Sequence, residues 1–276
     1  MAQHAKYIQA NANGLCATLQ ELVRVPTVNP PGRNYAQMVD LLQAKCAALS
    51  MSTEVLQVPT DEAIRVVPHA DEFPRLNLIA RWDVGAARTV HFNSHYDVVP
   101  VSQEWSRDPF DPAIQGRWLY GRGSDDMKDA IAATLMAIEA LQRCDVEPAF
   151  NVECSFTADE EIGGDLGAGY IAKHGHIHAD YIVNCEGGTG LGIGCGHNGV
   201  LWLEITVRGK AAHASRPENG LNAFEKMAEL ALRLRGLNDA FAEPTRAFTT
   251  PSGASRRPTI NMGGVFGGTE GDKENT

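Results

Sequence analysis

The stretch Thr89-Val-His-Phe-Asn-Ser-His-Tyr-Asp97 begins as a strand and runs straight into a histidine and an aspartate. His95 and Asp97 are two residues apart, so on an extended segment both side chains point to the same side. Three further stretches place carboxylates after a run of this kind or beside a predicted helix: Ser124–Lys128, Asp159–Glu161 and Cys185–Gly188. Open α/β sheets hold their ligands at the carboxyl ends of the strands. The four patches are therefore predicted to meet in one pocket suited to metal-assisted hydrolysis.

The rest of the chain supports an α/β fold with a mostly parallel sheet in three layers. Strand patterns alternate with helix patterns along the first two thirds of the sequence, as parallel sheets require. We expect strands over 77–82, 89–93, 150–156 and 181–185, helices over 14–24, 38–49 and 129–142, and a loop over 105–118.

The pattern of apolar and polar residues changes beyond Gly199. Apolar and polar residues alternate over 201–208, which is typical of a strand with one buried face. A helix over 221–235, a strand over 259–262 and a glycine-rich loop over 263–268 are predicted to follow. We therefore expect a catalytic domain over 1–196 and a smaller α+β domain over 197–276.

Composition excludes several classes of protein. The 276 residues are 43% hydrophobic and 21% charged, which is usual for a soluble globular chain. A net charge of -10 argues against nucleic-acid binding, which needs clustered Lys and Arg. No apolar run is long enough to span a membrane, and residues 1–6 lack the apolar segment of a signal peptide, so we expect a cytoplasmic location. The six cysteines form no Cys-x-x-Cys pair and are expected to be reduced.

Each acidic or histidine patch also has a simple structural explanation. His95 could be a surface histidine beside a turn-forming aspartate, and one of Asp125 and Asp126 could cap the following helix. The carboxylates of 159–161 could form a solvated loop, unless a cation neutralises them. His91 fits a packed strand interior, and the histidines at 174, 176 and 178 fit an exposed loop.

The order of the motifs carries more information than any one of them. His-x-Asp-Val-Val-Pro at 95–100, Gly-Arg-Gly-x-x-Asp-Met-Lys at 121–128, Asp-Glu-Glu-x-Gly-Gly at 159–164 and Gly-Lys-Ala-Ala-His-Ala at 209–214 occur together. In this order they resemble the zinc metallopeptidase and deacylase family of acetylornithine deacetylase, succinyl-diaminopimelate desuccinylase, aminoacylase and carboxypeptidase G. The resemblance covers nearly the whole chain from about residue 19.

The resemblance implies a role for each matching residue. Two zinc ions, which Co²⁺ could replace, would be held by His95 and Glu186 on one side and Glu161 on the other, with Asp126 between them. Asp97 would orient His95, and Glu160 would be the general base. The peptide bond between Asp125 and Asp126 would be cis. The second domain would be a lid that forms a homodimer, from which His213 would reach the partner's active site and stabilise the oxyanion.

Two departures from the family pattern stand out. Asp129 occupies a position where the family usually has glycine, which adds negative charge near the site. The family's chain normally continues past the equivalent of Thr276 and supplies a last zinc-ligating histidine that none of the nine histidines here matches by motif. Both domains are therefore expected to be incomplete at the C-terminus.

Three hypotheses about function remain open at this point. The first is hydrolysis of the amide bond of N-acyl amino acids, and the second is a carboxypeptidase or dipeptidase activity with the same metals. The third is a truncated, non-catalytic fragment that keeps the fold but not the turnover. None of them involves a nucleic acid or a membrane.

Overall fold

A computed structural model of the chain describes residues 2–68, 70–101, 104–187, 192, 194, 199–201, 203–241, 243, 248–249, 253 and 255–263. The chain divides into two compact units, residues 1–195 and residues 196–276. Gly188, Cys195 and the glycine-rich tail from residue 264 onward, all named in the sequence predictions, lie outside the described residues. Within the described ranges, no helix combines the length and apolar character that a membrane crossing requires.

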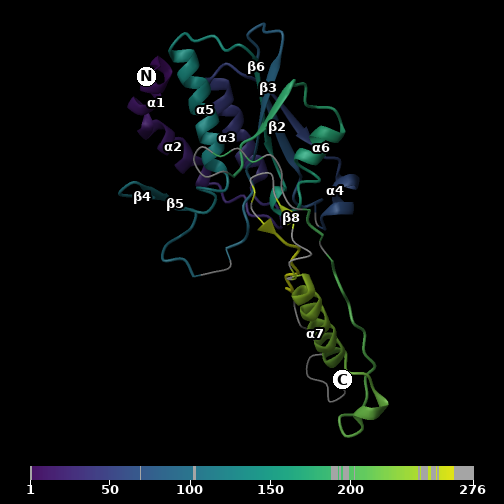
Figure 1. Ribbon diagram of the computed structural model, residues 1–276. Helices are drawn as coiled ribbons and strands as arrows, with labels where there is room; N and C mark the ends of the chain where they lie inside the picture. Colours follow the sequence, from purple (N-terminus) through teal and green to yellow (C-terminus); the bar gives the residue numbers. More distant parts are fainter. Residues whose placement is uncertain are drawn as a thin grey trace. The chain divides into compact units, whose positions relative to one another are not determined.

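A five-stranded sheet organises the first unit (Figure 1), in the order β1-β2-β6-β3-β7. The strands are β1 (Ser52–Gln57), β2 (Leu76–Trp82), β3 (Thr89–His95), β6 (Asn151–Thr157) and β7 (Tyr181–Asn184). β3 runs parallel to both β6 and β7, whereas β2 is antiparallel to β1 and to β6. Four strands therefore share one direction and only β2 opposes them, which confirms the predicted α/β fold with a mostly parallel sheet.

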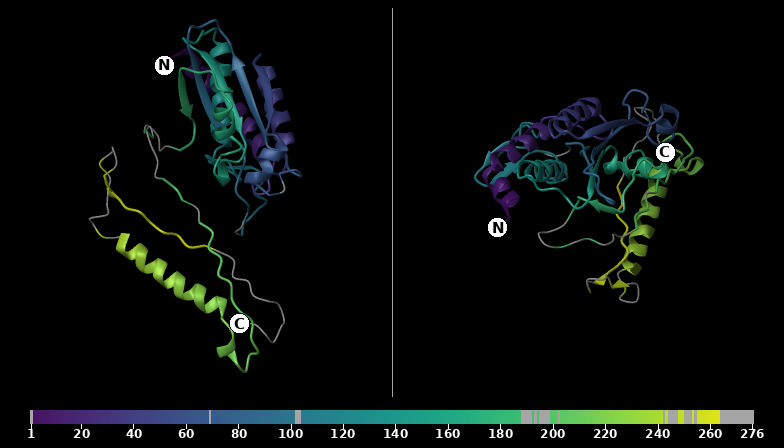
Figure 2. Two further views of the ribbon diagram at one scale, coloured as in Figure 1. Left: turned by 90° about the vertical axis from the view of Figure 1, so that its right-hand side faces the viewer. Right: turned by 90° about the horizontal axis from the view of Figure 1, so that it is seen from above.

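One face of the sheet carries the main apolar core. Four helices lie on this side: α3 (Tyr35–Ala48) and α5 (Lys128–Arg143) pack on the strands, and α1 (Gln3–Ala10) and α2 (Ala12–Val23) pack against α5. Alternate residues of the strands point to this side, so Leu78 and Phe156 pack with Leu42 of α3 and Ile131 of α5. Figure 2 shows these helices together on one side of the strands.

The opposite face of the central strands is polar. The short helices α4 (Thr60–Val66) and α6 (Ala168–Lys173) enclose a second, smaller apolar cluster there. On this face His91 of β3 is fully buried and contacts two residues of β6. Its Nδ1 lies 2.8 Å from Glu153 Oε1, and its Nε2 lies 2.8 Å from Ser155 Oγ. Arg81 Nε donates to Glu153 Oε2 at 2.7 Å. The prediction that His91 is a packed strand histidine is confirmed.

Glu153 should make the stability of this unit depend on pH. Burial alone would raise the pKa of its carboxyl, but hydrogen bonds from His91, Arg81 and the amide of His178 lower it from 4.5 to about 2. Because the folded-state pKa is depressed, the carboxylate stabilises the fold above pH 4.5, and this contribution is lost as the pH falls through 2. A shift of this size corresponds to about 3 kcal/mol.

The variant Glu153→Gln tests this contribution. Urea unfolding should show a gap in unfolding free energy between wild type and variant that is widest near neutral pH and narrows steadily below pH 4.5. The exposed Glu147→Gln is the control and should change the free energy by less than about 0.5 kcal/mol. A gap that stays constant down to pH 2 would contradict the assignment.

Gly167 marks a close backbone approach just before α6. A Cβ atom at this position would lie 1.9 Å from the carbonyl oxygen of Ala158, which directly precedes Asp159. Gly167→Ala should therefore destabilise the unit by roughly 1–3 kcal/mol. Gly14→Ala is the matched control in α2: its Cβ would meet only the Met136 Cε atom at 3.8 Å, so it should stabilise by about 0.5–1 kcal/mol. Thermal unfolding of both variants checks the two signs.

The second unit contains one long helix, α7 (Ala223–Phe241), a short 3-10 turn at Pro217–Asn219 and the two-residue strands β8 (Phe248–Thr249) and β9 (Ser255–Arg256). The predicted helix is confirmed and is longer than expected. The predicted strands over 201–208 and 259–262 are wrong, because the described residues of both segments are not in strands. Leu201 and Leu203 are 79% and 73% exposed, so the alternating pattern finds no buried face here.

Two further differences concern the first unit. The segment 105–118, predicted as a loop, contains β4 (Ala113–Gln115) and enters β5 (Trp118–Tyr120), and these two strands pair as a short antiparallel ribbon. The alternation that makes a strand is only three residues long in each, too short to detect against the surrounding Pro, Asp and Gly. The five cysteines in the described part of the chain are free, as expected.

Candidate metal centre

Three neighbouring parallel strands, β6, β3 and β7, bring the predicted site residues to one edge of the sheet. His95 is the last residue of β3, and it pairs in register with Thr157, the last residue of β6. The Asp159–Glu161 turn therefore begins two residues beyond His95 on the adjacent strand. On the other side of β3, β7 ends at Asn184, two residues before Glu186. The parallel pairing explains why sites distant in sequence meet here.

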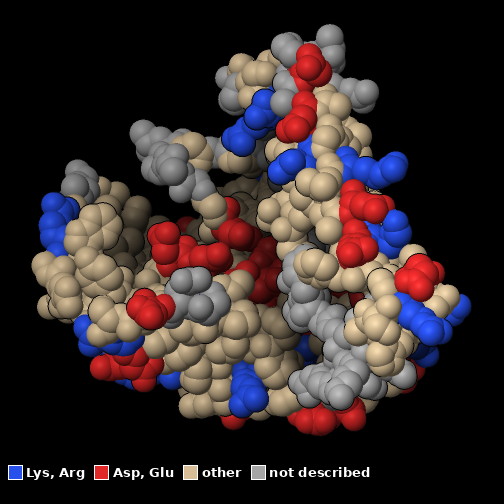
Figure 3. All heavy atoms as spheres, turned by 90° about the horizontal axis from the view of Figure 1, so that it is seen from below, with Lys and Arg blue, Asp and Glu red and all other residues tan. Residues whose placement is uncertain are grey.

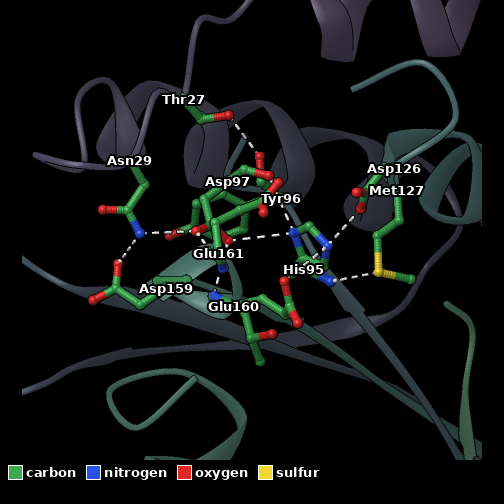
Figure 4. A network of polar contacts seen from close by, with 12 residues as sticks. Thr27, Asn29, His95, Tyr96, Asp97, Asp126, Met127, Asp159, Glu160 and Glu161 are labelled. Carbon is green, nitrogen blue, oxygen red and sulfur yellow. Dashed lines mark hydrogen bonds and ion pairs between the residues drawn. The ribbon is translucent and has the colours of Figure 1, made fainter. Parts of the chain in front are cut away.

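His95, Asp126 and Glu186 form a group that could hold a metal ion. One ligand atom of each lies within 4.8 Å of the ligand atoms of the other two. His95 Nε2 and Asp126 Oδ1 lie 3.0 Å apart (Figure 4). One imidazole nitrogen and two carboxylates fit the donor preference of zinc, and three protein ligands leave a position open, as in catalytic sites. The residues present therefore fit a divalent metal.

The imidazole of His95 is held from its other nitrogen. Nδ1 lies 3.1 Å from the backbone oxygen of Asp97 and 3.3 Å from its Oδ1. A ligating histidine usually has such a partner, which fixes the ring and leaves Nε2 for the metal. The side chains of His95 and Asp97 are 1% and 0% exposed, whereas that of Asp126 is 63% exposed. The buried pair forms the floor of the site, and Asp126 faces the solvent from which a substrate would come.

Glu160 and Glu161 follow Asp159 in a short 3-10 turn, Glu160–Ile162. Their backbone amides donate to the two oxygens of Asp97, at 3.2 Å from Glu160 and 3.3 Å from Glu161. The Glu160 carboxylate lies 3.7 Å from His95 Nε2 and is 44% exposed. The carboxylate of Glu161 stands outside the group of three, so the structure brings Glu161 to this edge without placing it on the same donor set.

The electrostatics of this edge are those of crowded carboxylates. Burial, followed by the charge of Asp126, raises the pKa of Glu161 to about 7, and burial also raises the pKa of Glu160. Burial on its own would lower the pKa of His95, but the hydrogen bond with Asp97 and the surrounding carboxylates together raise it to about 9. A metal ion that binds His95 would have to displace the proton that the imidazole carries below this pKa. Figure 3 shows a gathering of acidic side chains at the centre of the view from below.

The loop before α5 carries Asp126 into the site. Lys128, fully buried, donates from Nζ to the backbone oxygens of Leu22 at 3.1 Å and Val25 at 2.8 Å, near the end of α2. Burial lowers the pKa of this ammonium to about 7. The expected cis peptide bond between Asp125 and Asp126 is wrong by one position: the cis bond joins Asp126 to Met127, so it follows the candidate ligand and does not precede it.

His213 belongs to the second unit and is exposed. Its Nδ1 accepts the amide N–H of Ser215 at 3.2 Å and lies 2.9 Å from the Ser215 hydroxyl. With Nδ1 accepting, the neutral imidazole carries its proton on Nε2, where it can act as a donor.

Two buried residues that touch the site were missed by the sequence reasoning. Asn29 contacts both Asp97 and Asp159, and Arg75 contacts Asp159. Asn29 lies between a valine and two prolines, and neither Asn29 nor Arg75 belongs to a recognisable motif. Asp159 itself was counted with the other two acidic residues, although it is 1% exposed and points toward Asn29, away from His95 and Asp126.

The fold and the donor set describe an α/β protein with a candidate metal site at the carboxyl edge of its sheet. Comparison of the sequence with known protein families identifies the family. Peptidase family M20/M25/M40 matches residues 91–273, more than half of the chain. The chain belongs to this family.

Individual relatives are consistent with this assignment. The chain is 30% identical over 251 residues to an uncharacterized metallohydrolase of Methanocaldococcus jannaschii, covering 87% of this chain and 60% of that protein. It is 31% identical to succinyl-diaminopimelate desuccinylase of Dinoroseobacter shibae, covering 85% of this chain and 61% of that protein. The chain thus spans about three fifths of the length of these relatives.

Among solved structures, an M20 family metallo-carboxypeptidase of Sulfolobus solfataricus superposes with a TM-score of 0.53 at 26% identity, covering 63% of this chain and 37% of that chain. Human carnosine dipeptidase 1 gives a TM-score of 0.56 at 22% identity, over 66% of this chain and 40% of that one, which shows a shared fold.

Proposed function

We propose that this chain takes part in the metal-dependent hydrolysis of the amide bond of N-acyl amino acids. The observation that carries the proposal is the meeting of His95, Asp126 and Glu186 within 4.8 Å of one another, beside the carboxylate of Glu160. The similarity to a succinyl-diaminopimelate desuccinylase supports an acyl group as the part removed.

Each residue has a proposed role. His95 and Glu186 would hold one zinc ion, Glu161 would hold a second, and Asp126 would lie between the two. Asp97 would keep the His95 ring in place. Co²⁺ is expected to substitute for zinc, because the nitrogen and oxygen donors suit both ions.

A bound divalent metal would polarise the scissile carbonyl and lower the pKa of the attacking water. Glu160 would take a proton from the attacking water as the water oxygen forms a bond to the carbonyl carbon. The same carboxyl would deliver the proton to the amine as the C–N bond breaks, so the products are a carboxylate and an amine. The partner subunit's His213 would donate from Nε2 to the developing oxyanion, which requires a homodimer through the second unit.

A peptidase activity is the second candidate. The structural similarity to an M20 family metallo-carboxypeptidase favours it, since that protein shares 26% identity with this chain. The metals would polarise the carbonyl of a peptide bond, and the general base would transfer the proton, in the same way. We also propose a cytoplasmic location. Residues 1–196 would form the catalytic domain, and residues 197–276 would form the lid domain.

A substrate panel tests the proposal. The protein would be incubated with Zn²⁺ or Co²⁺ and with N-succinyl and N-acetyl amino acids, dipeptides and C-terminally free peptides, and release of free amine would be measured. We expect amine release from the N-acyl amino acids that stops when a chelator is added. Release from the peptides alone would favour the carboxypeptidase or dipeptidase reading. No release from any substrate by metal-loaded protein would contradict both and would favour the third hypothesis, a chain that keeps the fold but not the turnover.

A further inference from the structure

Asn29 lies between two buried carboxylates of the site. Its Nδ2 donates to Asp97 Oδ2 at 2.8 Å and to Asp159 Oδ1 at 3.0 Å. These three side chains come from segments far apart in sequence, and they are 1%, 0% and 1% exposed (Figure 4). Two carboxylates this close in a buried place repel each other unless donors separate them. The amide of Asn29 provides two such donors.

The orientation of the amide is fixed by its surroundings. Turning it over would direct the Asn29 oxygen at both carboxylates, so only the observed orientation gives hydrogen bonds. Asn29 Oδ1 is buried and has no hydrogen-bond partner among the described residues. The hydrogen bonds of the side chain therefore all go to Asp97 and Asp159, which is what a bridge between these two residues requires.

Two further donors hold the carboxylate of Asp159. Arg75 Nε donates to Oδ2 at 2.6 Å, and the Tyr35 hydroxyl donates to Oδ1 at 2.8 Å. Arg75 is fully buried, so its charge is matched by Asp159 in a medium that screens little. Asp159 also has a left-handed backbone conformation, with φ of 61°. Aspartate tolerates this conformation better than most residues, and the next two amides then face Asp97.

Asp97 is the point at which these contacts converge. Its carboxylate accepts the amides of Glu160 and Glu161, accepts Asn29 Nδ2 and lies 3.3 Å from His95 Nδ1. Any shift of this carboxylate would therefore move the ring of His95 and the start of the Glu160–Glu161 turn together.

We infer that Asn29 is a positioning residue that sets the geometry of the metal site through Asp97. It couples Asp97 to the Arg75–Asp159 ion pair, and so fixes the His95 ring relative to the Glu160 and Glu161 carboxylates. The inference rests on the proposed function, since it assumes that His95 binds a metal. Removal of hydrogen-bond partners behind metal ligands typically lowers metal affinity about 10–100-fold, and Asn29→Ala is expected to fall in that range.

Titration with Co²⁺, followed by its visible absorption, tests the inference without any substrate. The matched control is Asn151→Ala, at the opposite end of β6 from the site. The Asn151 side chain accepts the amides of Val84 and Ala86 at 3.0 Å and donates to the backbone oxygen of Ala86 at 2.9 Å. Urea unfolding of each variant separates general destabilisation from a local effect. We expect Asn29→Ala to bind Co²⁺ at least tenfold more weakly, with a changed spectrum, and Asn151→Ala to bind as wild type does.

The possible results distinguish the inference from the proposed function. If wild type and Asn29→Ala bind Co²⁺ equally well, or if Asn151→Ala weakens binding as much, Asn29 has no positioning role and the metal site stands. If wild type binds no Co²⁺, the proposed function and the inference fall together.

A second variant covers the case in which Asn29→Ala does not fold. Tyr35→Phe removes only the hydroxyl that donates to Asp159, and the remaining ring still packs in the core. It should weaken Co²⁺ binding several-fold, and unchanged affinity in that variant would overturn the inference.

Discussion

Glu160→Ala is expected to lower kcat by roughly 10²–10⁴-fold, the usual contribution of a general acid–base group, while the protein keeps its full metal content. The carboxylate lies 3.7 Å from His95 Nε2, close to the metal donors but outside their group of three. Its side chain is 44% exposed, so it can reach water and a substrate. Burial raises the pKa of its carboxyl, which makes the carboxylate a stronger base. The measurements are amine release at saturating substrate and metal content by elemental analysis.

Two controls give this result its meaning. Asp165→Ala removes an exposed carboxylate from the same loop and should leave both activity and metal content unchanged. Glu161→Ala should lower activity together with metal content, because Glu161 is proposed to be a ligand. If Glu160→Ala loses metal instead, Glu160 is a ligand and its assignment as general base is wrong.

Asp126→Ala should cause the largest loss of metal affinity of any single substitution in the site. Its Oδ1 lies 3.0 Å from His95 Nε2, and it is the residue proposed to lie between two ions. Its removal should disturb both ions, whereas Glu186→Ala should disturb one. The loss should exceed the roughly 10–100-fold effect of changing a residue behind a ligand. Competition titration with Zn²⁺ against a chromogenic chelator measures the affinity and the number of ions bound.

The neighbouring Asp125→Ala is the matched control for this prediction. Asp125 is also exposed and also acidic, yet it does not belong to the group of candidate ligands. It should bind metal as wild type does. Loss of metal in Asp125→Ala, with normal binding in Asp126→Ala, would move the ligand by one residue.

The sequence predicted the part of the fold in which local pattern and tertiary context agree. β3, β6 and β7 were located to within two residues, because each is an apolar or alternating run bounded by turn residues. β1 was missed, since its burial pattern leaves most of the strand exposed at the edge of the sheet. The strand expected over 201–208 did not form, because alternation alone cannot supply a neighbouring strand to satisfy the backbone.

The candidate site shows a similar division. His95, Asp97, Asp126 and Glu186 could be picked out as candidates, because metal-type side chains after predicted strands or beside a predicted helix are visible in the sequence. Asn29 and Arg75 were not, because their importance lies in contacts with Asp97 and Asp159 across gaps of 68 and 84 residues. A buried asparagine and a surface asparagine look alike in a sequence. The network that holds the site is therefore visible only in three dimensions.

Anomalous X-ray diffraction at the zinc edge, from crystals of the protein grown with Zn²⁺, shows whether His95, Asp126 and Glu186 bind the same metal ion. We expect a strong peak within bonding distance of His95 Nε2, an Asp126 oxygen and a Glu186 oxygen. A peak bound only elsewhere, for example at His174 or His176, or no ordered zinc at His95 at all, would contradict it.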